Sequence, residues 1–362
     1  MLQYVTNYKH MKEYTVLGLM SGSSLDGVDI ACCRFYESEQ QWHYQIMEAE
    51  TMAYSEQWKT FLIESLKVET TEFLARDVKF GRYLGSLVND FRERHLLKAD
   101  LIASHGHTLF HQPESGFSFQ LGSGQAIAIS TGIPTVSDFR TKDILLGGQG
   151  APLVPIGDTF LFSDYDCCLN IGGIANISYD ENTSRKGFDT CPANQLLNHL
   201  SGQMGMSYDK GGSLAFQGAF NPALFDLLNQ DAYYKLALPK SLSNEYVRQS
   251  FIALLDQFKA PVQDKLHTVV KHIAFQIAVS RVGSTGKRML VTGGGAHNTF
   301  LVQAIREAGG FELLIPERQL IDFKEALIFA FMGVLRHLGR DNCLATATGA
   351  KQNCSAGNIF YP

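Results

Sequence analysis

The feature that most constrains this chain is a pair of apolar runs joined by a turn of small polar residues. Residues 16–19 precede the turn and residues 28–33 follow it, which predicts a strand hairpin. A turn with so few bulky side chains lets backbone N–H groups approach an anion closely. We interpret it as a cradle for a nucleotide phosphate, in which Asp26 and Asp29 could hold a hydrated cation. An ordinary serine-rich turn is the alternative.

The composition is typical of a globular protein. The 362 residues are enough for two domains, and 45% are hydrophobic and 19% charged. A net charge of −5 leaves no basic surplus for nucleic acid or a membrane surface, and the longest apolar run, 326–335, is too short to span a bilayer. Seven cysteines without framework spacing predict reduced thiols and a cytoplasmic protein. Met11 reads like a natural start, so residues 1–10 could be an extension.

The opening pattern returns further along the chain. Strands are expected at 42–53, 100–104 and 134–138, and helical periodicity covers 62–97. A Gly/Pro-rich stretch at 146–155 is the best candidate for a domain boundary. Residues 165–179 again read as strand, glycine turn and strand, roughly 150 residues after the first hairpin. This predicts a duplicated α/β domain whose two turns face one cleft, with chance recurrence as the alternative.

A third glycine turn lies near the end of the chain. Residues 288–305 read as strand, Gly293-Gly294-Gly295 and helix, and such glycines let a flat ring or a sugar-phosphate lie against the backbone. A tight strand–helix corner is the alternative. Further helices are expected at 195–200, 222–229, 266–282 and 322–338.

The order of the three turns resembles that of the sugar kinase/heat-shock chaperone/actin superfamily. Within it, the residues are similar to those of the anhydro-N-acetylmuramic acid kinases. Residues 18–29 look like that family's signature, with Ser23 where threonine is usual. Similar segments follow in the family's order, from about residue 14 to the end, at 104–113, 139–143, 147–155, 169–176, 187–190, 208–210, 292–298 and 325–326.

The resemblance implies an α/β fold of two ribonuclease H-like domains with the active site in the cleft between them. The first domain is expected at 1–145, with 345–362 as a segment that could rejoin it, and the second at 146–344. The resemblance also implies a homodimer and a cleft that closes over ATP and sugar.

The implied activity is an ATP- and Mg²⁺-dependent kinase of peptidoglycan recycling. Water opens the 1,6-anhydro bridge of 1,6-anhydro-N-acetylmuramic acid at C1, and O6 takes the γ-phosphoryl group, giving N-acetylmuramic acid 6-phosphate. Asp189 matches the family's base, and Arg140 could pair with the lactyl carboxylate. His105, Asn176 and Glu325 are candidates for sugar contacts, and His105 or Glu325 could instead orient the water. The expected nucleotide-binding residues, with Asp26 also expected to hold Mg²⁺ through water, are Gly22, Ser23, Ser24, Leu25, Asp26, Gly27, Val28, Asp29, Gly172, Gly173, Gly293, Gly294, Gly295 and Asn298.

Several residues depart from the family's pattern and leave the substrate open. Cys191 and Ala193 stand where glycines are usual, His107 where glutamine is common and Asn198 where aspartate is common. The alternatives are a kinase for another anhydrosugar or a hexose, and a non-catalytic sensor of cell-wall fragments.

The candidate residues also have structural interpretations. Asp189 could cap the following helix, Arg140 could be a surface arginine, and Glu325 could be a first-turn carboxylate that the helix dipole stabilises. His105 and His107 are expected to share a strand face and, with His111, could suggest a metal site. Against that site, Glu114 is the only nearby carboxylate and no cysteine is near.

Overall fold

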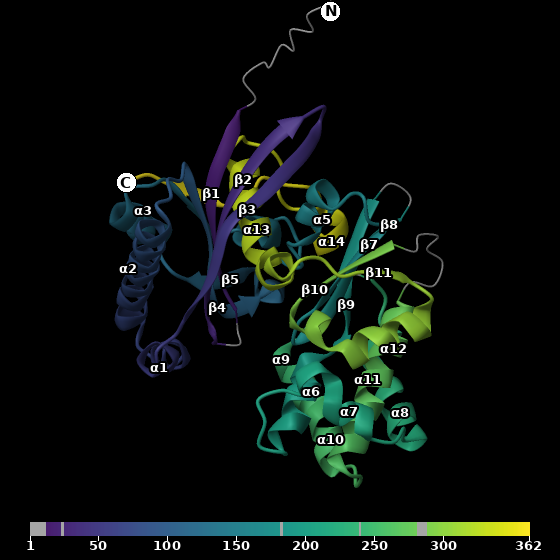
Figure 1. Ribbon diagram of the computed structural model, residues 1–362. Coiled ribbons are helices and arrows are strands. Elements are labelled where there is room, and N and C mark those ends of the chain that lie inside the picture. The colour runs from purple at the N-terminus through teal and green to yellow at the C-terminus, as the bar shows by residue number, and fades with distance from the viewer. Residues whose placement is uncertain (1–11, 23–24, 182–183, 239, 281–287) are drawn as a thin grey trace, which may run out of the picture. The chain divides into compact units, whose positions relative to one another are not determined.

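The computed structural model describes residues 12–22, 25–181, 184–238, 240–280 and 288–362, and the chain divides into two compact units (Figure 1). Unit 1 comprises Met1–Leu161 and Glu325–Pro362, and unit 2 comprises Phe162–Lys324. Each unit is built on one β-sheet covered by helices.

Unit 1 contains a seven-stranded sheet. Its strands are β1 (Glu13–Ser21), β2 (Gly27–Ser38), β3 (Gln41–Ala53), β4 (Leu101–Gln112), β5 (Phe117–Leu121), β6 (Thr135–Ser137) and β12 (Asn358–Phe360). Its helices are α1 (Glu56–Glu64), α2 (Thr70–His95), α3 (Gly124–Thr131), α4 (Thr141–Leu145), α5 (Pro155–Leu161) and α14 (Ala345–Thr348).

Unit 2 contains a five-stranded sheet. Its strands are β7 (Cys167–Ile171), β8 (Ile174–Glu181), β9 (Ser184–Pro192), β10 (Arg288–Thr292) and β11 (Glu312–Leu314). Its helices are α6 (Asn194–Gly202), α7 (Ser213–Gln217), α8 (Pro222–Asn229), α9 (Asn244–Tyr246), α10 (Ala253–Gln257), α11 (Val262–Val279) and α12 (Thr299–Gly309). The long α13 (Arg318–His337) begins in unit 2 and continues into unit 1, with a non-helical residue at Phe323.

The two sheets repeat one topology. In unit 1 the order β3-β2-β1-β4-β6 combines three antiparallel strands with two that run parallel to β1. In unit 2 the order β9-β8-β7-β10-β11 has the same pattern of antiparallel and parallel strand pairs. This is the ribonuclease H-like arrangement, so the predicted duplicated α/β fold is confirmed.

The core of unit 1 lies on both faces of its sheet. Leu17 and Leu19 of β1 face α2 and α3, where they pack in one cluster with Phe80 and Ile127. Gly18 faces the opposite way, against α13, and a Cβ there would lie 1.9 Å from the carbonyl oxygen of Ala326. The backbone of α13 therefore touches the backbone of β1, which only a glycine permits.

This packing explains where unit 1 ends. We expected the first domain to end near residue 145 and to resume near residue 345, but the compact unit ends at Leu161 and resumes at Glu325. The buried half of α13 belongs to unit 1 because it packs on β1, and Gly157 of α5 packs on the same helix at Ile328.

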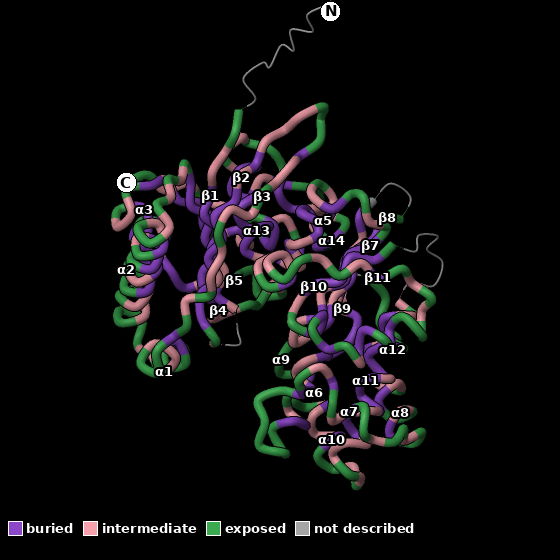
Figure 2. The backbone as a smooth tube through the Cα atoms, viewed as in Figure 1, coloured by how far each residue is buried: buried purple, intermediate pink, exposed green. Residues whose placement is uncertain are grey.

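In unit 2 the helices cover one face of the sheet. Leu169 and Ile171 of β7 form a buried cluster with Leu196 of α6, Ile273 of α11 and Leu301 of α12. Figure 2 shows burial following the strands and the sheet-facing sides of the helices, whereas the connecting loops are largely exposed. Among the helices of the described residues, none combines the length and apolarity needed to cross a membrane.

The Gly18 contact predicts a stability change. The added methyl of Gly18→Ala has to displace the α13 backbone, so we expect a loss of about 1–3 kcal/mol in the free energy of unfolding, measured by urea denaturation. Gly202→Ala is the matched control, since a Cβ there meets nothing within 4 Å. Equal stability of the Gly18→Ala variant and the unmodified protein would contradict the close packing of α13 on β1.

Candidate functional site

The turn of the first hairpin carries part of the predicted phosphate site. Ser23 and Ser24 lie outside the described residues. Leu25 has a φ of 60°, and its N–H donates to the carbonyl oxygen of Gly22 at 3.4 Å. The described part of the turn is thus tightly folded on itself, and its left-handed residue is a leucine rather than a glycine.

The start of β2 completes this hairpin. Gly27 packs on β3, where a Cβ would lie 2.4 Å from a carbonyl oxygen, and Val28 is buried in the core. The Asp29 carboxylate accepts a hydrogen bond of 2.6 Å from the hydroxyl of Thr51, whereas Asp26 is exposed. The carboxylate of Asp26 is therefore the one more open to solvent.

A bulge in β4 separates the two histidines that were expected to share a face. β4 advances three residues, from Ser104 to His107, while β1 advances two, and Gly106 takes a φ of +73°. His105 lies beside Phe329 of α13, with ring centroids 4.6 Å apart, whereas His107 lies 6.4 Å from Phe80 of α2. The expectation of a shared face is wrong, because the extra residue reverses the alternation. No group of three or more His, Cys, Asp or Glu in the described ranges is arranged to hold a metal.

His105 holds Arg140 by a neutral ring. The ring nitrogen Nδ1 of His105 lies 2.9 Å from the carbonyl oxygen of Gly106 and donates to it, so Nε2 accepts from Arg140 Nε at 3.1 Å and Nη2 at 2.9 Å. Burial, and then the charge of Arg140, lower the pKa of His105 well below its usual range. Because a neutral imidazole has one donor and one acceptor, these contacts assign its tautomer.

Arg140 is also fixed from its other side. Its Nη1 donates to the carbonyl oxygen of Gly150, whose N–H in turn donates to Asp143 Oδ2 at 2.8 Å. The hydroxyl of Thr348 donates to Asp143 Oδ1 at 2.7 Å. Burial lowers the pKa of Arg140 to about 10, and the nearby charge of Glu325 opposes that fall, so the guanidinium stays charged at neutral pH. His105, Arg140 and Glu325 therefore belong to one electrostatic group in unit 1.

In unit 2 a row of polar residues crosses four strands. Thr292 of β10 pairs with Asn170 of β7, which pairs with Asn176 of β8, which pairs with Asp189 of β9. Directly paired residues share a face of a sheet, and this face is opposite the one that packs on α6 and α11. Asn170, Asn176 and Asp189 are all partly exposed. The row therefore connects the predicted base with the strand that leads into the triple glycine.

Asp189 is held at three points. Its Oδ2 accepts a hydrogen bond of 2.9 Å from the N–H of Leu242, its N–H donates to the carbonyl oxygen of Lys240, and its own carbonyl oxygen accepts from the hydroxyl of Tyr233. Burial raises the pKa of Asp189 to about 6, and the hydrogen bond from Leu242 opposes this rise. Such a carboxylate is mostly ionised at pH 7 and still basic enough to accept a proton.

The two residues that replace family glycines lie behind this base. Cys191 and Ala193 are both fully buried in the core cluster of unit 2, where Cys191 pairs with Ala175 on β8. Burial raises the pKa of the Cys191 thiol to about 12, which keeps it protonated. Their side chains face the helices, on the opposite side of the sheet from Asp189.

The second hairpin and the triple glycine pack on each other. A Cβ on Gly293 would lie 2.4 Å from Asn170 Oδ1, and one on Gly295 would lie 2.2 Å from Ile171 Cγ2. The carbonyl oxygens of Gly172 and Gly173 accept hydrogen bonds from the N–H groups of residues 193–195, at the start of α6. The predicted nucleotide residues of unit 2 thus meet in one place.

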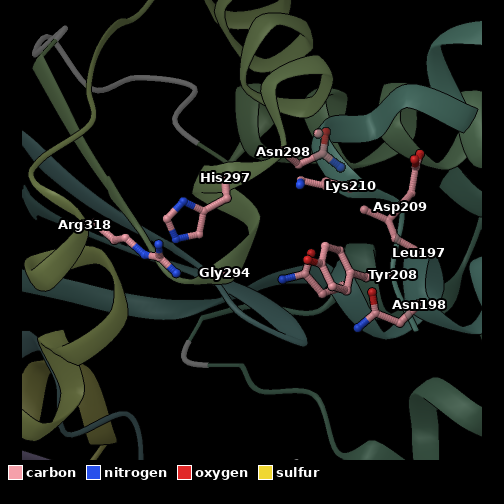
Figure 3. Close-up of a pocket in the computed structure, with 11 residues that line it drawn as sticks. Leu197, Asn198, Tyr208, Asp209, Lys210, Gly294, His297, Asn298 and Arg318 are labelled. Atoms are coloured by element: carbon pink, nitrogen blue, oxygen red, sulfur yellow. The ribbon is translucent and has the colours of Figure 1, made fainter. Parts of the chain in front are cut away.

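A pocket of about 480 Å³ opens beside this corner (Figure 3). Of the predicted residues, Gly294 and Asn298 line it, and Asn298 also caps α12 through a 3.0 Å bond from the N–H of Leu301. The other lining residues are Asn194, Leu197, Asn198, Tyr208, Asp209, Lys210, Gly211, His297 and Arg318.

Sequence reasoning missed the basic groups of this pocket. Figure 3 shows His297 and Arg318 close together at one side, with Lys210 across from them. Asp322 joins the first two, since it accepts from His297 at 2.9 Å and from Arg318 at 3.2 Å. Lys210 lies in the segment 208–210 that resembles the family, which is a signal for it, whereas no motif marks Arg318.

A smaller pocket of about 240 Å³ lies in unit 1, and His105 forms part of its wall. Its two carboxylates, Asp77 and Asp138, have pKa values raised by burial. Both already accept internal hydrogen bonds, Asp77 from the N–H of Gly122 at 2.7 Å and Asp138 from the hydroxyl of Thr141 at 2.6 Å. Both carboxylates therefore already have hydrogen-bond donors within the fold.

Comparison with known proteins adds independent information. A family model described as anhydro-N-acetylmuramic acid kinase matches residues 14–362. Proteins of that name from Synechococcus elongatus and Shewanella putrefaciens are each 34% identical, covering 95% and 97% of this chain and 99% of each relative. Among solved structures, component A of the (R)-2-hydroxyglutaryl-CoA dehydratase of Acidaminococcus fermentans is 14% identical with a TM-score of 0.44, covering 88% of this chain and 97% of its own.

The environment of Asp189 predicts its titration. We expect the carboxyl group to titrate with a midpoint of about 6, because burial disfavours its charge. The measurement is a carboxyl ¹³C NMR titration, with the signal assigned by its loss in Asp189→Asn. A midpoint near the ordinary aspartate value of about 3.9 would contradict the buried setting.

Proposed function

Since this chain belongs to the anhydro-N-acetylmuramic acid kinase family, we propose that it uses ATP to open and phosphorylate 1,6-anhydro-N-acetylmuramic acid. Because it belongs to this family, the chain is a kinase of peptidoglycan recycling. The observation that carries the proposed chemistry is Asp189, a partly exposed residue whose carboxyl group has its pKa raised by burial to about 6, in a polar row that leads to the glycine corner.

Asp189 is proposed as the base for the attacking water. Its Oδ2 is engaged by the N–H of Leu242, and among the described residues no hydrogen bond engages Oδ1. Water attacks C1 of the sugar and gives its proton to Oδ1 while the C1–O6 bond breaks. The freed O6 takes the γ-phosphoryl group, and ADP leaves. Asn176 lies beside Asp189 in the row and is suited to orient the water or a sugar hydroxyl.

The glycine turns are proposed to bind ATP. Phosphoryl transfer depends mostly on positioning and charge neutralisation, which backbone N–H groups and cations supply. We assign the first hairpin to the phosphates, and the corner of Gly293, Gly294 and Gly295 with its 480 Å³ pocket to the adenosine. Mg²⁺ prefers oxygen ligands, and the exposed carboxylate of Asp26 fits that preference through water. The ion, when bound, neutralises phosphate charge.

Arg140 is proposed as the receptor for the lactyl carboxylate. A guanidinium has five N–H donors, and three of them are used by His105 and the carbonyl of Gly150. One donor remains on each Nη nitrogen, which is the pair that a carboxylate accepts in bidentate fashion. Glu325, whose charge acts on Arg140, is assigned to a sugar hydroxyl.

The burial of Cys191 and Ala193 supports the muramic acid derivative over another sugar. Both side chains pack into the helical core rather than beside Asp189, so their departure from the family's pattern changes the support of the loop and not its polar face. We also propose a homodimer, by family resemblance, and a cytoplasmic location, which fits the seven free thiols.

The decisive assay combines product mass with isotope labelling. With Mg·ATP and 1,6-anhydro-N-acetylmuramic acid, we expect ADP release and a product heavier than the sugar by one phosphoryl group and one water, with oxygen from labelled water at C1. Asp189→Asn is the matched variant, expected to fold and to lose about 10²–10⁴-fold in kcat. Phosphorylation without label at C1 would show another substrate, and sugar binding without ADP release would show a sensor.

Arg140 is tested by comparing two sugars. The unmodified enzyme should have a lower KM for 1,6-anhydro-N-acetylmuramic acid than for 1,6-anhydro-N-acetylglucosamine, which lacks the lactyl group. In Arg140→Gln this preference should vanish because the charged hydrogen bonds are lost, at a cost of about 1.5–3 kcal/mol, or roughly 10–100-fold in KM. A preference that persists in the variant would remove Arg140 from carboxylate recognition.

A further inference from the structure

Three buried polar side chains lie beneath the first hairpin, and the proposed reaction does not use them. The hydroxyl of Ser21 lies 2.7 Å from the hydroxyl of Tyr54 and 2.8 Å from Nδ1 of His107. The exposed fractions of Ser21, Tyr54 and His107 are 3%, 5% and 5%. They form one hydrogen-bonded network that links β1, the residue that follows β3, and β4.

The hydrogen-bonded network of Ser21, Tyr54 and His107 is uncharged at neutral pH. Burial lowers the pKa of His107 to about 4 and raises the pKa of Tyr54 above its ordinary value. The Ser21 hydroxyl can therefore donate to one neighbour while it accepts from the other. Buried networks whose members are satisfied hold their side chains in one arrangement.

Tyr54 contacts both sides of the phosphate turn. Its hydroxyl binds Ser21, the last residue of β1 before the turn, and its backbone N–H donates to the carbonyl oxygen of Asp26 at 3.2 Å. Its ring lies 6.3 Å from the rings of both Phe80 and Tyr83 of α2. The two ends of the turn are thus tied to one residue that is itself anchored by α2.

His107 reaches this place because of the bulge at Gly106. A Cβ on Gly106 would lie 2.7 Å from the carbonyl oxygen of Leu121, so the bulge is packed against β5. His107 pairs with Ser21 on one side and Leu121 on the other. The position of the hairpin is therefore coupled to β4 by a side chain rather than by a strand alone.

We propose that Tyr54 and His107 are positioning residues that hold the first hairpin in the arrangement that receives the phosphates of ATP. This inference rests on the proposed function of the hairpin. It assigns nucleotide affinity to two residues outside the expected nucleotide-binding set. Their loss should weaken nucleotide binding and leave sugar recognition unchanged, because the residues proposed to contact the sugar, Arg140 and Asp189, are held by hydrogen bonds to other partners.

The test measures nucleotide affinity without turnover. The probe is Mg²⁺ with a non-hydrolysable ATP analogue, titrated calorimetrically into the full chain. Tyr54→Phe removes only the hydroxyl, and His107→Leu removes the ring nitrogen that is hydrogen-bonded to Ser21. Each is expected to raise the Kd of the analogue and the KM for ATP about tenfold, with the KM for the sugar within about twofold.

Two further variants separate positioning from general packing. Tyr83→Phe alters a neighbouring tyrosine, whose ring stacks on Trp58 at 3.9 Å, and should bind the analogue like the unmodified protein. His107→Asn places an amide atom where Nδ1 lies, and it should restore most of the affinity that His107→Leu loses.

Each outcome decides one question. If the unmodified protein does not bind the analogue, the proposed function fails. If it does bind, and Tyr54→Phe and His107→Leu bind equally well, the positioning role is overturned. A loss in Tyr83→Phe as large as in Tyr54→Phe, or a parallel rise in the KM for the sugar, would also overturn it by showing a general loss of packing.

Discussion

The close approach of α13 to β1 is the constraint on which the rest of unit 1 depends. Because Gly18 has no side chain, Ala326 can lie against the strand, and this contact sets the register of the helix along the sheet. One position before Ala326, the charge of Glu325 raises the pKa of Arg140. Three positions after it, Phe329 packs on His105. A single backbone contact thus determines which residues surround the proposed carboxylate receptor.

Burial then determines the charge states of the polar groups. His105 stays neutral because it is buried beside a cation, and Arg140 stays charged because the nearby charges of Glu325 and Asp143 oppose the fall in its pKa on burial. Asp189 gains basicity from the same physical effect, while one backbone N–H keeps its pKa from rising further. A site of this kind has its protonation states prepared before substrate binds, which lowers the reorganisation needed during the reaction.

The three turns could be predicted from the sequence because apolar runs flank each group of small residues, and the fold class followed from the recurrence of this pattern and from the order of the turns, which resembles that of a known superfamily. The bulge at Gly106 could not, since a glycine inside a strand pattern indicates a bulge without showing which side chains it redirects. The boundary near residue 325 was missed because one continuous helix, α13, crosses it. Helical periodicity shows which face of a helix is apolar but does not show where along the helix its packing changes from one unit to the other. Asn170 was missed because only the strand register shows that it lies in one row with Asn176 and Asp189, and Arg318 was missed because no motif marks the start of α13 as part of a pocket.

The duplicated hairpins show that one local pattern can be supported in two ways. In unit 2 the tip is held by backbone, since the carbonyls of Gly172 and Gly173 accept hydrogen bonds from the start of α6. In unit 1 the stem is held by side chains, through Ser21, Tyr54 and His107. A backbone support tolerates most substitutions, whereas a side-chain support is lost with one atom. The two halves of the chain therefore differ most in how their corresponding turns can be altered by mutation.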